Sequence, residues 1–164
     1  WIDGVLSMEK DWPYYPDANF SMRLTYGTVK SYEPQDAKIY KYYTTLDGVM
    51  EKEDPNNWEF VVHPRLKELW KAKDYGDYGD GDQMKVCFIS NNDITGGNSG
   101  SGMINGRGEL IGLAFDGNWE AMSGDIAFEP DLQRCIGVDI RFVLWIIDKF
   151  AGATHLVNEM TLAY

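Results

Sequence analysis

The sequence predicts a mainly antiparallel β domain with a C-terminal helical tail. Apolar and polar residues alternate from Phe20 to Tyr26, which is the period of a half-buried strand. The turn Asn105–Gly108 separates two strand-like runs, and Asn and Gly tolerate the positive φ of a tight hairpin. Apolar residues recur at helical spacing from Ile140 to Phe150, and Gly152 follows as a stop signal.

Helices are expected at three other places. Residues 1–12 carry apolar side chains with charges between them and are typical of the end of a helix. Pro13 terminates this segment, because proline lacks the backbone donor that a helix needs. Another helix is predicted to begin at Pro64, where apolar residues recur at spacings of three and four on one face. A short helix over residues 154–162 is expected after Gly152.

Further strands are expected as short runs between polar or glycine-rich connections. These runs are Ile39–Thr45, Phe60–Val62, Val86–Ile89, Gly102–Asn105, Glu109–Phe115 and Arg134–Val138. The loop Asp74–Asp82 is rich in glycine and aspartate, a composition that suggests a calcium-binding site. It lacks the alternating ligands and the distal glutamate of an EF-hand loop, so a solvated loop is favoured. The sequence therefore predicts neither a metal site nor a cofactor.

Length and charge limit the classes of function. The chain has 164 residues, which corresponds to about one domain. Its 26 acidic and 15 basic residues give a net charge of −11, which repels phosphate and disfavours nucleic acid as a partner. The longest apolar run, Val143–Ile147, is far shorter than the ~20 residues of a membrane span. No secretion signal is recognisable, and since the chain begins at Trp1 we expect that its natural N-terminus has been removed.

The two cysteines, Cys87 and Cys135, are too few for a disulfide framework or a structural zinc site. They could form one bridge between neighbouring strands. Two buried free thiols are the favoured interpretation.

The segment Asn91–Asn105 carries the clearest chemical signal, because it places Ser99 inside a glycine-rich turn between two strands. A serine hydroxyl is a weak nucleophile unless a base takes its proton and donors stabilise the oxyanion that forms. Glycines allow consecutive backbone N–H groups to point into one concavity. We therefore expect the N–H groups of Gly97 and Ser99 to form an oxyanion hole. A plain glycine-rich hairpin with a solvent-facing serine is the alternative.

The order Gly97-Asn98-Ser99-Gly100-Ser101 resembles the serine loop of chymotrypsin-like peptidases. In the digestive enzymes an aspartate at the position of Asn98 pairs with a newly cut N-terminus, and this pairing activates the zymogen. Because Asn98 replaces that aspartate, this activation switch is expected to be absent. Longer blocks resemble serine-peptidase family 46, the bacterial dipeptidyl-peptidases of type 7 and type 11. These blocks cover nearly the whole chain, at residues 15–32, 44–62, 91–101, 108–126 and 138–153.

The resemblance implies a chymotrypsin-like double β-barrel with a helical domain inserted in the chain that caps the cleft. Residues 1–12 are then the end of the inserted helical domain. Residues 13–139 are the second barrel, of the six-stranded type, and residues 140–164 are the C-terminal helical tail. The family usually has proline where this chain has Gly102, which implies a looser turn after the nucleophile.

The same resemblance assigns roles to four residues. Ser99 matches the nucleophile, and the backbone of Gly97 and Ser99 matches the oxyanion hole. Asp116 matches the carboxylate that binds the free α-amino group of the substrate, and a partly buried carboxylate suits that cation. Gly117 stands where the acidic-specific type carries arginine, so an uncharged pocket is expected. We therefore expect release of N-terminal dipeptides with an aliphatic or aromatic penultimate residue, as in type 7.

A catalytic triad also needs a base, and the sequence offers only His63 and His155. His63 precedes a helix start and is expected to cap it, and His155 is expected to be exposed. The resemblance places the histidine and aspartate of the triad before Trp1, in the remaining N-terminal part of the parent enzyme. The fragment alone is therefore expected to be inactive.

The resemblance also implies a location in the periplasm or cell envelope of a Gram-negative bacterium. Peptides are the expected substrates, and a homodimer through the face that the first barrel would cover is a further expectation. Two other functions remain open. One is a chymotrypsin-like endopeptidase half, and the other is a carbohydrate- or peptide-binding β module that uses the chain's many aromatic residues.

Overall fold

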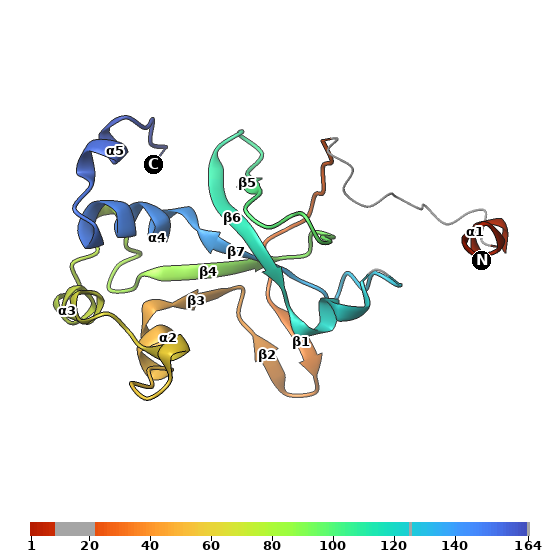
Figure 1. The fold of residues 1–164 in the computed structure, drawn as a ribbon, viewed down its shortest axis with the longest axis horizontal. Helices are drawn as coiled ribbons and strands as arrows, with labels where there is room; N and C mark the ends of the chain where they lie inside the picture. Colours follow the sequence, from red (N-terminus) through yellow and green to blue (C-terminus); the bar gives the residue numbers. More distant parts are fainter. Residues whose placement is uncertain (9–21, 125, 164) are drawn as a thin grey trace.

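The computed structural model describes residues 1–8, 22–124 and 126–163, and this part of the chain is mainly β with two sheets and short helices (Figure 1). The larger sheet is antiparallel and has five strands. In spatial order they are β3 (Tyr43–Thr45), β4 (Lys85–Ser90), β7 (Cys135–Asp139), β6 (Leu110–Gly117) and β5 (Gly102–Ile104). The smaller sheet pairs β1 (Tyr32–Gln35) with β2 (Lys38–Tyr40).

The centre of the large sheet packs closely around Phe88 of β4. A Cβ on Gly112 would lie 2.6 Å from the Phe88 ring and 2.6 Å from the carbonyl oxygen of Val138. Because Gly112 in β6 has no side chain, the Phe88 ring can occupy this space. Any larger residue at position 112 would push β6 away from β7. β7 lies between β4 and β6 and buries every second residue, as a central strand does.

Five helical segments of the described chain, which do not include α1 (Ile2–Met8), gather at one end of the large sheet (Figure 1). They are α2 (Leu46–Glu51), α3 (Pro64–Ala72), α4 (Ile140–Trp145), a π-helical turn η4 (Ile146–Phe150) and α5 (Thr154–Asn158). Trp145 is fully buried beside Leu46, Tyr75 and Met84, and its indole N–H donates to the Asp74 carbonyl at 2.8 Å. This core fixes the helical end of the sheet, and the glycine-rich segment that contains Ser99 lies outside it.

Several expected elements are confirmed. α1 (Ile2–Met8) is helical, α3 begins at Pro64, and the hairpin between β5 and β6 turns at Asn105–Gly108. The tail is helical from Ile140, although α5 ends at Asn158. Residues 9–12 of the first expected helix lie outside the described residues.

Two expected strands are wrong. Phe20 lies outside the described residues, and residues 22–28 form no strand; only Val29 makes an isolated bridge, to Ser90. Met22, Leu24 and Tyr26 are 98%, 89% and 89% exposed, because no strand of the described chain lies against them.

The second error concerns Phe60–Val62. Trp58–Phe60 forms a 3₁₀ turn, η1, and Val61 and Val62 continue outside any strand. The side chain of Asn57 accepts the Glu59 N–H at 3.2 Å and starts this turn. A local cap thus prevails over the β preference of two valines.

The large sheet is open where a six-stranded barrel is expected. Its outer strands, β3 and β5, each pair with one neighbour in the described part of the chain. A sheet closes into a barrel only when its two edge strands pair with each other or with a further strand. Residues 22–26, the described part of the strand expected from Phe20 to Tyr26, do not supply one.

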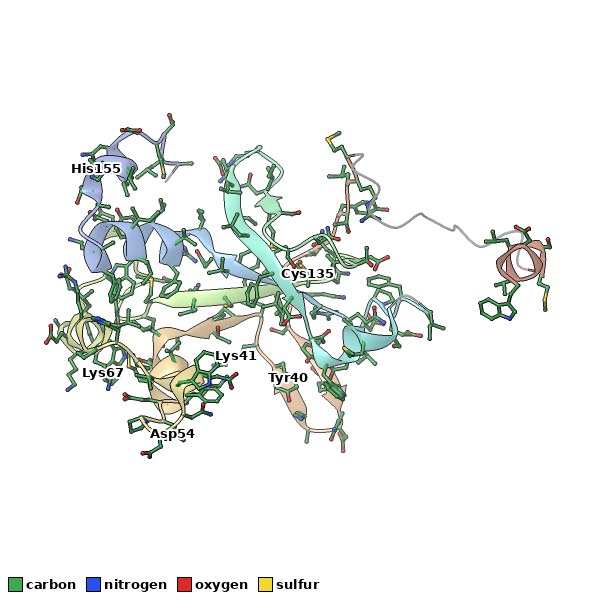
Figure 2. The ribbon with its side chains drawn as sticks, in the orientation of Figure 1. Tyr40, Lys41, Asp54, Lys67, Cys135 and His155 are labelled. Atoms are coloured by element: carbon green, nitrogen blue, oxygen red, sulfur yellow. The ribbon has the colours of Figure 1, made fainter. Side chains whose placement is uncertain are left out.

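Both cysteines are free. Cys87 lies opposite Val138 and Cys135 lies opposite Ser90, so the register separates the two thiols along the strands. Cys135 is buried in β7 (Figure 2), and burial raises the pKa of its thiol to about 11. In the described ranges, no helix has both the length and the apolar character required to cross a membrane.

Candidate active site

Ser99 lies between β4 and β5, in the second of two consecutive β-turns. The Asn98 N–H donates to the Thr95 carbonyl at 3.2 Å, and the Ser101 N–H donates to the Asn98 carbonyl at 3.0 Å. The third residue of each turn is a glycine with positive φ, 101° at Gly97 and 81° at Gly100. A type II turn requires such a φ at that position, so the glycine pattern determines this backbone path.

The turns leave two backbone donors available. Ser99 is exposed, and within the described residues neither its N–H nor that of Gly97 donates a hydrogen bond. The side chain of Asn98 is engaged instead, because its Oδ1 accepts the Thr95 N–H at 3.1 Å. Asn98 thus closes the first turn, and the donors on either side of it stay free for a ligand.

The serine turn is anchored to the neighbouring strand β6. The Gly100 N–H donates to the Ala114 carbonyl at 2.7 Å, and the Ala114 N–H donates to the Ser101 carbonyl at 2.9 Å. Ser99 therefore lies beside the part of β6 that leads to Asp116 and Gly117. The structure brings the predicted nucleophile and the predicted substrate-binding residues to one region of the sheet.

An open groove of about 770 Å³ runs beside this region, between residues 23–28 and the loop that leads to Ser99. Thr28 and Asn91 hold its two sides together, because the Asn91 N–H donates to the Thr28 carbonyl and the Thr28 N–H donates to Asn91 Oδ1, at 3.2 and 2.7 Å. A Cβ on Gly27 would lie 2.7 Å from the Asn92 nitrogen, so only glycine allows this approach. Asn98 lines the groove, so the groove lies next to Ser99, the predicted nucleophile.

Asp116 follows a β-bulge in β6. Ala114 lies opposite Gly137 and Asp116 lies opposite Ile136, so Phe115 is the extra residue. The bulge exposes Phe115 and Asp116 in succession, which a regular strand with its period of two would not do. The expected partial burial of the Asp116 carboxylate is thus not seen. In this chain it is exposed, and Oδ1 accepts the Gly117 N–H at 2.8 Å.

Gly117 is half-buried at the end of β6. A Cβ there would lie 3.1 Å from Ala121 Cβ and 4.0 Å from Cδ1 of Ile94, which also lines the groove. A side chain added at this position would therefore point toward the groove wall. The space next to Gly117 is bounded by these two apolar side chains and by the carbonyl oxygen of Arg134, 3.7 Å away.

Sequence reasoning missed the polar residues behind Gly117. Asn118, Glu120 and Arg134 form hydrogen bonds that join the end of β6 to the loop before β7. Each of them is an isolated polar residue in a loop or a turn, and because they follow no spacing pattern, no local signal in the sequence marks them.

Neither histidine belongs to this site. His63 caps α3, where its Nδ1 accepts the Arg65 N–H at 3.1 Å, and its ring packs edge-on against Phe150. His155 is exposed on α5, at the helical end of the sheet (Figure 2). Both expectations for these residues are confirmed.

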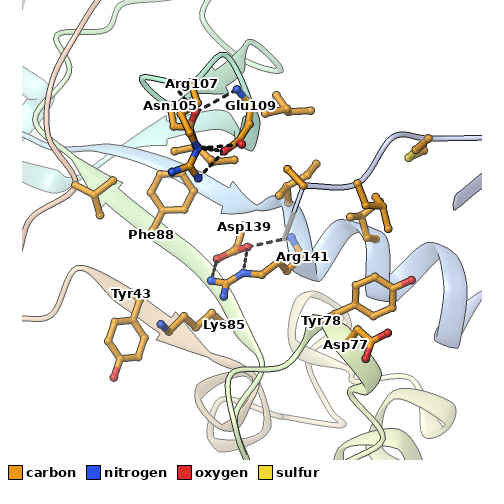
Figure 3. Close-up of a pocket in the computed structure, with 18 of the residues that line it drawn as sticks. Tyr43, Asp77, Tyr78, Lys85, Phe88, Asn105, Arg107, Glu109, Asp139 and Arg141 are labelled. Carbon is orange, nitrogen blue, oxygen red and sulfur yellow. Dashed lines mark hydrogen bonds and ion pairs between the residues drawn. The ribbon is translucent and has the colours of Figure 1, made fainter.

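A larger cavity, of about 1060 Å³, lies at the other end, between the β5–β6 hairpin, α4 and the C-terminal residues (Figure 3). Its cations each pair with a carboxylate: Lys85 with Asp80, Arg107 with Glu109, and Arg141 with Asp139. Ser99 and Asp116 do not line it. These three cations are therefore neutralised in pairs, and Asp77 adds a further carboxylate to the lining.

The Asp74–Asp82 loop is held by lysines. Asp82 accepts a hydrogen bond from Lys73 at 2.9 Å, and Asp80 pairs with Lys85. These contacts lower the pKa of both carboxyl groups. In the part of the chain that the structure describes, no three His, Cys, Asp or Glu residues gather as metal ligands.

Comparison with known proteins gives consistent matches. The sequence model of the family Peptidase S46 matches residues 1–162. The chain is 63% identical over 164 residues to the dipeptidyl-peptidase 7 of Phocaeicola vulgatus, a match that covers 99% of this chain and 23% of the relative. It is 53% identical over 163 residues to the Asp/Glu-specific dipeptidyl-peptidase of Porphyromonas gingivalis, again covering 99% and 23%.

Among solved structures, the crystal structure of Porphyromonas endodontalis DPP11 in complex with the dipeptide Arg-Glu is similar, with a TM-score of 0.87 and 52% identity. The match covers 96% of this chain and 23% of that one. The chain thus spans less than a quarter of the length of the relatives it matches.

Proposed function

The chain belongs to the Peptidase S46 family, and on that premise we propose that it is the part of a serine dipeptidyl-peptidase that carries the nucleophile. The whole enzyme would release dipeptides from the N-terminus of peptides. The observation that carries this proposal is the double turn, in which the exposed Ser99 has its own N–H and that of Gly97 free, beside an open groove.

In the proposed reaction, Ser99 Oγ attacks the carbonyl carbon of the second substrate residue while a base takes its proton. Negative charge then develops on the carbonyl oxygen, and the N–H groups of Gly97 and Ser99 stabilise it. Each such donor typically contributes about 2.7–4 kcal/mol in the transition state. When this intermediate collapses, the peptide C–N bond breaks and the base gives its proton to the amine of the departing shortened peptide. Water then hydrolyses the acyl-enzyme and releases the dipeptide.

Asp116 is proposed to hold the substrate's free α-amino group. A peptide N-terminus is cationic at neutral pH, so a carboxylate at a fixed distance from Ser99 selects chain ends over internal segments. The exposure of Asp116 in this chain is compatible with that role if the rest of the enzyme covers it. The bulge at Phe115 supports the proposal, because bulges re-aim side chains next to active sites.

Gly117 is proposed to leave room for an aliphatic or aromatic penultimate side chain. Its side-chain neighbours, Ala121 and Ile94, are apolar and uncharged.

The base is proposed to come from the rest of the enzyme, since His63 and His155 lie elsewhere. In that arrangement this chain is the second barrel of a chymotrypsin-like double barrel, and the first barrel supplies histidine and aspartate. The 164-residue chain by itself would then be inactive. A periplasmic or envelope location of a Gram-negative bacterium is part of the same proposal.

Two serine variants of the full-length enzyme test this function. We expect Ser99→Ala to lower kcat for a dipeptidyl reporter amide by on the order of 10⁶-fold. Ser101→Ala is the matched control, because Ser101 contributes only backbone bonds to the turn, and it should retain activity. An active Ser99→Ala enzyme would contradict the proposal. Equal cleavage of a substrate with a blocked N-terminus would favour an endopeptidase instead.

A further inference from the structure

Arg134 is a buried cation that the proposed reaction does not use. The residue is 2% exposed, and backbone carbonyls accept hydrogen bonds from Nη1 and Nη2, whereas the buried Nε has no partner among the described residues. Nη1 donates to Pro130 and Gln133 at 2.9 and 2.7 Å, and Nη2 donates to Ser31 and Asp131 at 3.2 and 3.0 Å. A planar guanidinium presents several donors in a fixed fork, so Arg134 fixes the loop 130–133 against the segment at Ser31.

The backbone of Arg134 is joined as firmly to Asn118. The Asn118 N–H donates to the Arg134 carbonyl at 2.9 Å, and the Arg134 N–H donates to Asn118 Oδ1 at 2.8 Å. Asn118 Nδ2 donates to the Leu132 carbonyl at 2.7 Å. The residue that follows Gly117 is therefore held from three directions by the loop that Arg134 gathers.

Tyr32 and Glu120 close the set of contacts. The Tyr32 hydroxyl donates to Glu120 Oε2 at 3.0 Å, and Asn118 Nδ2 donates to the same oxygen at 2.8 Å. The guanidinium of Arg134 lies over the Tyr32 ring, 5.2 Å from its centroid. Tyr32, Asn118, Glu120 and Arg134 thus form a closed ring of contacts, which we call the Arg134 cluster.

The Arg134 cluster lies directly behind Gly117. Gly117 is opposite Cys135, the next residue after Arg134, and a Cβ on Gly117 would lie 3.7 Å from the Arg134 carbonyl oxygen. The other close neighbour is Ala121, which follows Glu120 in the turn η3 (Trp119–Ser123). Both sides of the space next to Gly117 are therefore built on residues of the cluster or adjacent to them.

We propose that Arg134 is a positioning residue that fixes the pocket for the penultimate substrate side chain, by holding Asn118 and the end of β6 in place. This inference rests on the function proposed above. The cluster does not touch the serine turn, which is anchored separately through Ala114. Loss of Arg134 should thus loosen the pocket and leave the nucleophile intact.

The test uses the full-length enzyme and three reporter dipeptidyl amides with penultimate Ala, Leu or Phe. We expect Arg134→Gln to raise KM about tenfold for the Leu and Phe substrates and less than about threefold for Ala, since a large side chain depends most on pocket shape. Phosphonylation of Ser99 by a small phosphonate without a peptide portion should stay within about twofold of wild type. Arg134→Lys keeps the charge without the fork, so its effect should be intermediate.

Arg107→Gln is the control, because Arg107 is an exposed arginine of the β5–β6 hairpin, and it should change neither KM nor the labelling rate. Equal losses across the three substrates and the small phosphonate would overturn the inference, as would unchanged KM ratios.

If Arg134→Gln does not fold, Tyr32→Phe is the deciding variant, because it removes only the hydrogen bond to Glu120. It should raise the Leu-to-Ala KM ratio about twofold to threefold, and an unchanged ratio overturns the inference. A wild-type enzyme that releases no dipeptide would refute the proposed function itself.

Discussion

The backbone N–H of Gly100 donates to the carbonyl oxygen of Ala114 at 2.7 Å, and this bond ties the serine turn to β6. Two residues beyond Ala114 stands Asp116, and one residue before Gly100 stands Ser99. The proposed nucleophile and the proposed amine-binding carboxylate are therefore positioned by one strand pairing. Their separation fixes how many substrate residues fit between them, which is the property that an enzyme releasing dipeptides needs.

The first prediction concerns Gly100, whose φ is 81°. We expect Gly100→Ala to lower kcat at least about tenfold, because a Cβ is strained at this φ although nothing lies within 4 Å of it. Gly106→Ala is the control, since its surroundings are also open and no positive φ is recorded there. Steady-state kinetics of the full-length variants measures both. Equal activity of the two variants would show that the turn geometry does not position Ser99.

Replacing Asp116 by Asn tests the amine site. The change removes the negative charge and keeps the size, so we expect kcat/KM for a dipeptidyl amide with a free N-terminus to fall by about 10²-fold or more. The difference between free and acetylated substrates should shrink in parallel. If the variant still prefers a free N-terminus as strongly as wild type, another residue binds the amine.

Gly117→Arg tests the pocket. The Cβ of the new arginine would lie 3.1 Å from Ala121 Cβ. Its guanidinium would place a positive charge near the penultimate side chain of the substrate. We expect kcat/KM for a penultimate Leu substrate to fall and that for Glu to rise, which changes their ratio by about 10²-fold or more. Gly117→Met fills the same space without charge and should lower the Leu rate without any gain for Glu. A Glu rate that does not rise in Gly117→Arg would place the pocket elsewhere.

Cys135 makes stability depend on pH in the alkaline range. Burial raises the pKa of its thiol to about 11, whereas an unfolded cysteine ionises near its usual value of about 8.5. Above about pH 8.5 the thiol loses its proton in the unfolded chain but keeps it in the folded chain. The thiol's contribution to the free energy of unfolding is therefore complete below about pH 8.5 and is lost as the pH rises toward 11. The slope approaches about 1.4 kcal/mol per pH unit.

Denaturant titrations at several pH values measure this effect. The difference in the free energy of unfolding between wild type and Cys135→Ala should narrow from pH 8 to pH 10. A difference that stays constant over this range would show that Cys135 titrates normally when folded.

The sequence was sufficient where local chemistry determines the structure. Glycines at the third position of two turns determine the backbone around Ser99, and the Asn105–Gly108 turn determines the β5–β6 hairpin. His63 before Pro64 marks a helix start that the structure confirms. In each of these places the residues that decide the conformation lie within five positions of one another.

The sequence was insufficient where distant segments decide. Residues 22–28 alternate like a strand, yet alternation cannot provide the partner strand that the described chain lacks there. The exposure of Asp116 follows from a bulge that is visible only in the register of β6 against β7. Arg134 contacts Ser31, 103 positions away, so its role depends on tertiary packing alone.

The most direct test of this account is a crystal structure of the full-length enzyme after reaction with a dipeptidyl phosphonate. The account predicts a phosphorus bonded to Ser99 Oγ, with a phosphonyl oxygen about 2.7–3.1 Å from the backbone nitrogens of Gly97 and Ser99. The inhibitor's ammonium group should lie beside the Asp116 carboxylate. An adduct on a different residue, or a phosphonyl oxygen that meets neither amide, would contradict it.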